Sequence, residues 1–191
     1  RAANFSKVDA SLESEFESLP YVKAAIPEIW VLPAKIDSED IPFGFVNPPT
    51  VYGLDLGEYF SSNASGWIGN VEKGTVLRPS DTGSVMIGKK IGEDFRKFVG
   101  STIKIDGKVF KVKAILEGES DLIANIIVMN LSDARDLSPL TADKVSSYTV
   151  VLTDFSKDRQ VAALMKLRHE DDIDVLTQAD TGVRDEVAAD L

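Results

Sequence analysis

Two short phrases in this sequence place an acidic side chain beside turn residues, as some hydrolases do. Asp81-Thr82-Gly83-Ser84 matches the phrase of aspartic proteases, and Asp180-Thr181-Gly182 repeats its first three residues. In those enzymes two carboxylates share one proton and act as acid and base. The preceding segments, VLRPS and LTQA, are not the strongly apolar strands this chemistry needs, and Asp-Thr-Gly is common in turns. We expect Asp81 in a turn, and an aspartic-type hydrolase using Asp81 and Asp180 stays as an alternative.

The stretch from Gly83 to Lys90 has the spacing G-x-x-x-x-G-K-K, close to that of a phosphate-binding loop. The four intervening residues, Ser-Val-Met-Ile, are mostly apolar and suit a strand better than a backbone cradle for phosphate. Lys90 also lacks the hydroxyl that such loops offer to Mg²⁺. We therefore expect a strand over residues 84–87 and no nucleotide site.

The single histidine, His169, precedes three acidic residues, Glu170 to Asp172. Neighbouring residues at a helix end point in different directions, so they do not readily converge on one metal ion. The chain has no cysteine, which excludes disulfides, thiolate metal sites and a cysteine nucleophile. The sequence predicts no catalytic residue, no cofactor and no metal site.

Composition narrows the class of protein further. The 191 residues are 43% hydrophobic and 27% charged, which is typical of a folded body. The net charge of −10 repels phosphates and anionic lipids, so we expect no nucleic-acid partner. No apolar run reaches about 18 residues, the length of a membrane span. Because the sequence begins at Arg1 without Met, we expect it to be a piece of a longer protein.

Two surface features are candidates for interaction or modification. Asn63-Ala64-Ser65 is a glycosylation sequon inside a polar stretch, and we predict Asn63 as the modified residue. The apolar side chains of Phe43, Phe45 and Val46 fall in a Pro- and Gly-bearing loop. If exposed, they form a partner-binding loop; the alternative is that Phe43 and Phe45 fold back into the core.

Hydrophobic periodicity predicts the elements that position these residues. The clearest is a hairpin, in which Asp106-Gly107 joins strands 102–105 and 108–116 and puts Ile103, Ile105, Phe110 and Val112 on one face. A β-α-β unit is predicted near the end, from strand 148–152, helix 157–169 and strand 173–176. The remaining predictions are a helix over 8–19, an edge strand within 24–36 broken by prolines, strands at 50–54, 84–87 and 125–131, a polar surface stretch over 58–73 and helical spacing over 91–99.

The order of these segments resembles a known family. SVMIGKKIGEDF, VGSTIKIDGKVFKVKAIL and DLIANIIVMNLSDARDL, with LESEFESLPYVKAAIP, VYGLDL and VEKGTVL upstream, are similar to the extracytoplasmic core domain of MacB-like ABC-transporter permeases. That group includes the FtsX and lipoprotein-releasing permeases. The resemblance covers most of residues 8 to 178, while residues 41–49 and 57–73 depart from the family pattern.

The resemblance implies an α+β fold with two subdomains. Residues 1–53 and 145–191 would form a Porter-like subdomain that contains the β-α-β unit, and residues 54–144 an inserted, β-rich Sabre-like subdomain. One transmembrane helix would precede Arg1 and three would follow Leu191. The domain would lie outside the cell membrane and carry no nucleotide site of its own.

The same resemblance implies a role and partners. The permease would work with a cytoplasmic ABC ATPase subunit and a second permease copy, and the domain would couple ATP hydrolysis to substrate export or release, or to regulation of an extracytoplasmic adaptor. The alternative from another class is a stand-alone extracellular binding module. We expect the isolated domain to be a monomer, because dimerisation of such permeases can depend on membrane helices.

Overall fold

The computed structural model describes residues 6–42, 47–64, 66–118, 120–169 and 173–177. Short helices alternate with strands along the chain. In order, the elements are β1 (Val8–Asp9), α1 (Leu12–Glu17), β2 (Val22–Val31), β3 (Lys35–Ile36), β4 (Glu39–Asp40), β5 (Thr50–Leu54), α2 (Leu56–Ser61), the 3-10 helix η1 (Trp67–Gly69), β6 (Val71–Gly74), β7 (Ser84–Ile87), α3 (Lys89–Asp94), β8 (Thr102–Ile105), β9 (Lys108–Leu116), α4 (Asp121–Ala124), β10 (Ile126–Asn130), α5 (Leu131–Arg135), β11 (Lys144–Val145), β12 (Ser147–Leu152), the 3-10 helix η2 (Phe155–Lys157) and α6 (Asp158–Arg168).

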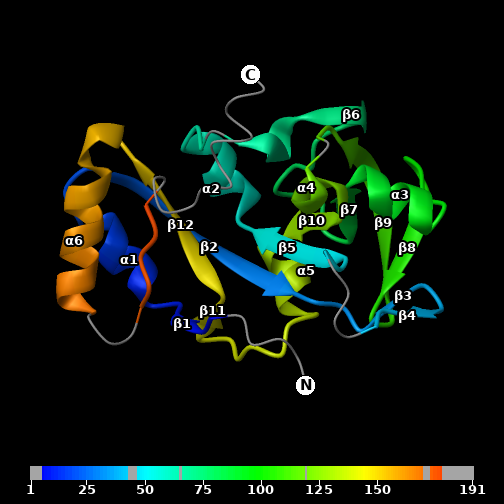
Figure 1. The fold of residues 1–191 in the computed structure, drawn as a ribbon, viewed down its shortest axis with the longest axis horizontal. Helices are drawn as coiled ribbons and strands as arrows, with labels where there is room; N and C mark the ends of the chain where they lie inside the picture. Colours follow the sequence, from blue (N-terminus) through cyan, green and yellow to red (C-terminus); the bar gives the residue numbers. More distant parts are fainter. Residues whose placement is uncertain (1–5, 43–46, 65, 119, 170–172, 178–191) are drawn as a thin grey trace.

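A mixed ten-stranded sheet organises the molecule (Figure 1). Its strand order is β12-β2-β5-β10-β7-β9-β8-β3-β4, and β6 pairs with the end of β9. The pairs β5–β10 and β7–β9 are parallel, while the other pairs are antiparallel. In Figure 1, α1 and α6 lie together at one end of the molecule, and α3, β8 and β9 lie at the other. A separate two-stranded ladder joins β1 to β11.

The core follows from alternation along the strands, since successive side chains point to opposite faces of a sheet. On one face, side chains of β2, β5 and β10 pack with α3 and α5 in a first cluster; on the other they pack with α2, η1 and α4 in a second. Phe16 of α1 and Val161 and Met165 of α6 form a third cluster over Ala25 of β2. The sheet is therefore covered on both faces.

The predicted hairpin is confirmed. Asp106 and Gly107 have φ angles of 45° and 89°, as a primed two-residue turn requires. Ile103 lies opposite Phe110, and both are buried with Ile105. The strands predicted at 50–54, 84–87 and 148–152 are also present, and all five residues of β10 are buried.

The prediction of an edge strand within residues 24–36 was wrong. β2 lies between β12 and β5, and Pro27 stands opposite Tyr148 inside the ladder. A proline fits there because β5 pairs with β2 only from Glu28 to Val31, so within the described residues one side of β2 has no ladder partner at Pro27. Ile26 and Ile29 beside it are completely buried. The strand ends at Val31, before Pro33.

Four other predictions need correction. The first helix begins at Leu12 because Val8 and Asp9 pair with β11. Residues 58–73 contain α2, η1 and β6 instead of a polar surface stretch, and Tyr59 and Ile68 are buried there. Helix α3 ends at Asp94, short of the predicted 99. Residues 173–177 belong to no ladder, so the predicted strand 173–176 is wrong, although Ile173 and Val175 pack against the third cluster.

The fold class is the predicted one, an α+β fold of two subdomains. The boundaries proposed at residues 53 and 145 stay a prediction. β3 and β4 come from the first segment of the chain, yet β3 pairs with β8 at the far end of the sheet, and β4 pairs with β3. Within the described residues, no helix has the length and apolar character needed to cross a bilayer.

Candidate functional site

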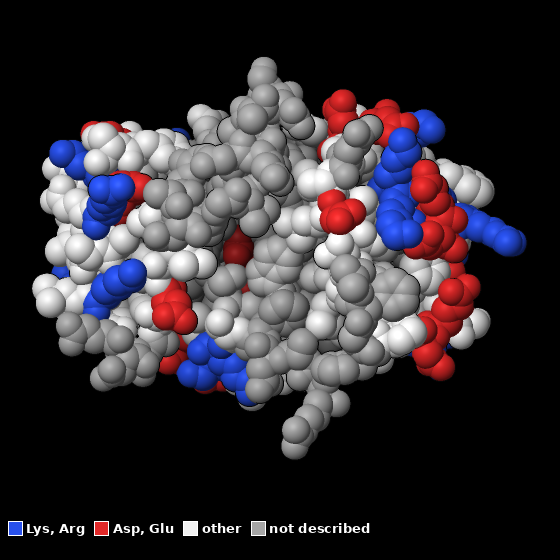
Figure 2. Space-filling model, in the orientation of Figure 1, with Lys and Arg blue, Asp and Glu red and all other residues white. Residues whose placement is uncertain are grey.

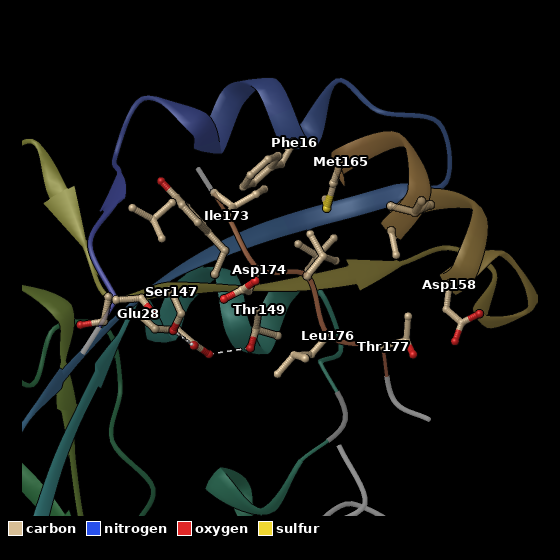
Figure 3. Close-up of a pocket in the computed structure, with 18 of the residues that line it drawn as sticks. Phe16, Glu28, Ser147, Thr149, Asp158, Met165, Ile173, Asp174, Leu176 and Thr177 are labelled. Carbon is tan, nitrogen blue, oxygen red and sulfur yellow. Dashed lines mark hydrogen bonds between the residues drawn. The ribbon is translucent and has the colours of Figure 1, made fainter. Parts of the chain in front are cut away.

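A pocket of about 880 Å³ lies along the outer edge of β12 (Figure 3). It is bounded by β12, α1, α6 and the segment 173–177, which runs beside β12 in Figures 1 and 3. Its apolar wall comes from helices and from the segment 173–177, through Phe16, Val161, Met165, Ile173 and Val175. The volume falls in the range of small-molecule sites.

The pocket follows the strand edge and reaches both faces of the sheet. β12 is the end strand of the sheet and pairs only with β2 among the described residues. Tyr148, Val150 and Leu152 turn toward the third cluster, while Ser147 and Thr149 stand opposite Glu28 and Ile26 on the other face. Because side chains of both sets line the pocket, one side of it is apolar and the other polar.

The polar side is built around Glu28, whose side chain is buried although it belongs to a strand of apolar residues. Its Oε1 atom accepts hydrogen bonds from the hydroxyls of Tyr52 and Thr149, each at 2.5 Å. Its Oε2 atom accepts one from Ser147 at 2.6 Å. A buried carboxylate is costly unless it is hydrogen-bonded, and three hydroxyl donors meet that requirement. Figure 3 shows the bonds from Ser147 and Thr149.

An aromatic row extends this network along the sheet. The Trp30 ring stacks on Tyr52 with 4.1 Å between ring centroids, and Tyr52 lies 6.1 Å from Trp67. The Trp30 Nε1–H donates to the Ser147 hydroxyl at 3.3 Å. The stacking and the hydrogen bond hold Trp30 and Ser147 in fixed positions at the inner end of the pocket.

The rim of the pocket is acidic. Asp174 projects from the extended segment into the pocket, and Asp158 lies at the start of α6 (Figure 3). Lys7 is the single basic residue among the described residues that line it. Phe155 and Leu176 are 62% and 70% exposed, so apolar surface is open to solvent beside the pocket. The pocket therefore combines apolar walls with an excess of carboxylates.

Asp81 lies in a turn, as predicted. Its carboxylate accepts a hydrogen bond from the Arg78 N–H at 2.8 Å and forms an ion pair with Lys113 at 2.8 Å. The hydrogen bond from Lys113, followed by that from Arg78, lowers the pKa of Asp81. The turn is fixed further by the Asn130 side chain, which donates to the Asp81 carbonyl, and by Asp133, which accepts from the Gly83 N–H. These contacts hold the turn that leads into β7.

A cluster of three carboxylates joins α1 to α2. Glu13 and Glu17 of α1 and Glu58 of α2 each place an oxygen within 4.8 Å of the others. Burial, and then the negative charge of Glu17, raises the pKa of both Glu13 and Glu58. Exposed acidic groups often gather without an ion, so this geometry alone identifies no metal site.

The other predicted residues fall in different places. His169 contacts the end of α1, with its Nε2 atom 3.0 Å from Glu15 Oε1 and its ring edge-on to Phe16. Asn63 is exposed at the end of α2, so its glycosylation stays a prediction. The predicted partner-binding loop of Phe43, Phe45 and Val46 lies outside the described residues, as does Asp180.

Sequence reasoning missed the pocket and Glu28. The one available signal was an acidic residue inside the apolar strand AAIPEIWV, since a buried carboxylate needs partners. Those partners, Ser147 and Thr149, are 119 and 121 positions further along the chain. Only the pairing of β12 with β2 brings them together.

Comparison with known families decides what kind of domain this is. Residues 1–168 match the family described as the MacB-like periplasmic core domain. The chain belongs to this family. The MacB-like domain is a periplasmic or extracellular part of ABC-transporter permeases, which work with cytoplasmic ATPases. The resemblance predicted from the sequence is confirmed.

Solved structures share the fold of this MacB-like domain. The extracellular domain of the noncanonic ABC-type transporter YknZ from Gram-positive bacteria has 13% identity and a TM-score of 0.61, covering 87% of each chain. The periplasmic region of MacB from Actinobacillus actinomycetemcomitans also has 13% identity and a TM-score of 0.61, covering 95% of this chain and 83% of its own. A domain of a putative permease from Porphyromonas gingivalis has 14% identity and a TM-score of 0.50, covering 88% and 74%. No curated protein matches the chain.

Proposed function

We propose that this MacB-like domain is the extracytoplasmic part of a permease, and that it couples cytoplasmic ATP hydrolysis to substrate export or release, or to regulation of a partner outside the membrane. The family match over residues 1–168 carries the proposal. The sheet supports it, because β2, β5 and β10 link the end that holds α1 and α6 to the end that holds β8 and β9. Because β5 and β10 pair across the boundary between the two proposed subdomains, a displacement of one subdomain would reach the other as a change in the twist of the sheet.

The two subdomains would have different roles. Residues 1–53 and 145–191 form the Porter-like subdomain, which receives movement from membrane helices, and residues 54–144 form the Sabre-like subdomain, which moves relative to it. The partners are a cytoplasmic ABC ATPase subunit, a second permease copy and an extracytoplasmic substrate or adaptor protein. The full protein would lie in the cell membrane with this domain outside.

Spin labels test the coupling directly, because the chain has no cysteine of its own. Phe98 and Leu167 are 69% and 73% exposed and lie in different proposed subdomains. In the full-length permease with its ATPase, otherwise free of cysteine, the Phe98→Cys/Leu167→Cys pair should give a different distance distribution with ATP than without nucleotide. Pulsed electron paramagnetic resonance measures it.

The matched control places both labels in one subdomain. Val109 is 61% exposed, so a Phe98→Cys/Val109→Cys pair should keep one distance distribution throughout. If the pair that spans the subdomains also keeps one distribution in every nucleotide state, the proposed coupling is wrong.

The pocket favours a second candidate function, a stand-alone extracellular binding module. Its apolar walls and buried Glu28 are features of ligand sites in general and do not require a transporter. The parent gene distinguishes the two functions. Apolar spans of about 20 residues beside this segment are required by the permease and not by the module.

A further inference from the structure

Among the described residues, the polar side chains at the inner side of the β12 pocket can accept hydrogen bonds but have no hydrogen left to donate. The Ser147, Thr149 and Tyr52 hydroxyls all donate to Glu28, and the Trp30 indole N–H donates to Ser147. Each of these side chains has one polar hydrogen, so each is already used. A polar group that bonds to these side chains must therefore bring its own hydrogens, and the donors beside them are the outward backbone N–H groups of the edge strand β12.

Acceptor positions, in contrast, are still open. A hydroxyl oxygen has two lone pairs and each carboxylate oxygen about two. Among the described residues, Thr149 accepts no bond, Ser147 accepts only the one from Trp30, and Glu28 Oε2 accepts only the one from Ser147. These atoms come from neighbouring positions on β12 and β2, so one donor group can reach several of them.

The charged groups of the pocket also favour a ligand that donates hydrogen bonds and carries a positive charge. Glu28 lies at the inner side, and Asp174 and Asp158 line the pocket nearer to solvent. Against these three carboxylates, the described part of the lining offers one ammonium group, that of Lys7, whose side chain is exposed. A cation is favoured where carboxylates gather beside apolar walls of low dielectric, and an anion is repelled.

We propose that the pocket binds an amphipathic cation, a molecule with an apolar body and a protonated amine. The amine would donate to Thr149, Ser147 and Glu28 and lie near Asp174, while the apolar body would contact the wall formed by α1, α6 and the segment 173–177. The pocket of about 880 Å³ accommodates a drug-sized molecule. Binding to the chain alone is measured without the transporter, so this proposal and the coupling proposal can fail separately.

Four octyl compounds that differ only in the head group test the proposal by calorimetric titration of the 191-residue chain at pH 7. Octylamine is charged and donates, octyltrimethylammonium is charged but cannot donate, octanol is neutral, and octanoate is an anion. Octylamine should bind at one site, about tenfold or more tightly than octanol or octanoate, as expected for hydrogen bonds to a charged group. Octyltrimethylammonium should fall between them.

Two substitutions locate the site. Asp174→Asn removes an exposed charge at the mouth. Thr149→Val, which is similar in shape, removes the open hydroxyl acceptor and also the hydrogen bond that Thr149 donates to Glu28. Each should weaken octylamine binding by about threefold or more, while octanol binding changes little. Glu39→Gln in β4 removes one charge at the opposite end of the sheet and should leave all four affinities unchanged.

The results that overturn the proposal are equally specific. Equal affinity for octylamine and octanoate would show that the pocket does not select a cation. Failure of every probe to bind would show that it is not a site of this kind. If Thr149→Val and Asp174→Asn, shown by thermal unfolding to be folded, bind octylamine like the parent chain, the amine does not lie where we place it.

Discussion

The Asp81 carboxylate is held by partners that fix a turn, and both of them contact its Oδ2 atom. It bonds to the Arg78 N–H and to Lys113, both at 2.8 Å, and its side chain is 19% exposed. The hydrogen bonds from Lys113 and from the Arg78 N–H lower the pKa of Asp81, so its charge is stabilised by partners within the turn and on β9. Its contacts therefore favour a structural role, and the family is one of transporter domains.

Replacement of Asp81 by asparagine should destabilise the domain in a pH-dependent way. Because the folded-state pKa is lowered, the contribution is complete above about pH 4 and is lost as pH falls through that pKa. Asp81→Asn should lower the free energy of unfolding by about 0.5 kcal/mol at pH 7, and by less near pH 3. Denaturant unfolding at both pH values measures this.

A second carboxylate provides the control for Asp81. Asp94→Asn removes the same charge from a more exposed ion pair with Lys90, and it should cost less. If Asp81→Asn is as stable as the parent chain at pH 7, the contacts of Asp81 do not stabilise the turn.

The carboxylate cluster between α1 and α2 should make the domain less stable as pH rises, whereas Asp81 makes it less stable as pH falls. The pKa of Glu13 and of Glu58 is raised, so this cluster stabilises the fold least at neutral pH and loses stability as pH rises above about 4.5. Glu17→Gln removes one charge from the cluster and from the last turn of α1. It should raise stability by about 0.3 kcal/mol at pH 7 and have little effect at pH 4.

Thermal unfolding at these two pH values checks the prediction for Glu17. Glu117→Gln, at an exposed position after β9, gives the same change in net charge without the cluster. An equal gain from both substitutions would mean that net charge, and not the cluster, is responsible.

At the scale of elements, close contact between α5 and the sheet depends on one glycine. A Cβ atom at Gly53 of β5 would lie 2.1 Å from the Cβ of Ala134 in α5. Ala134 is completely buried. Helix α5 contacts both β5 and β2, so the position of these strands and of this helix is set by the absence of a side chain at residue 53.

A double-mutant cycle tests this contact. Gly53→Ala should destabilise by about 2 kcal/mol or more because the packed interface must separate. Ala134→Gly alone should cost about 1 kcal/mol through its helix propensity. In the double variant the new methyl group at residue 53 has space. Denaturant unfolding should therefore show a loss of stability well below the sum of the two single losses. Simple additivity would show that the two residues do not compete for the same space.

Over the whole molecule, charged side chains are abundant, and basic ones lie next to acidic ones. Figure 2 shows lysine and arginine side chains next to acidic ones on the end formed by β6, α3 and β9, without a broad basic area on this face. The net charge of −10 adds repulsion between copies. These features suit a domain that stays soluble outside a membrane.

We expect the isolated 191-residue chain to be a monomer. Light scattering should give a mass near 20.8 kDa at low ionic strength and at physiological salt. Salt screens repulsion between copies, so a dimer that appears in both conditions would show an interface in this domain. That result would contradict the expectation that dimerisation depends on the membrane helices.

The sequence by itself determined the family and those local elements whose pattern is uninterrupted. The hairpin at Asp106-Gly107 follows from a turn that needs positive φ between two alternating strands, both local properties. The strand 126–130 follows from an uninterrupted apolar run. The order of such pieces was enough to identify the MacB-like domain.

Only the tertiary structure decided the place of β2 inside the sheet and the pocket at its edge. Pro27 argued for an edge strand, but it lies just before Glu28, where the pairing of β2 with β5 begins, so the strand can be central and still contain a proline. The extended segment 173–177 stays apart from the ladder and leaves space beside β12. Glu28 meets Ser147 and Thr149 through strand register, which brings distant residues together and which no local pattern encodes.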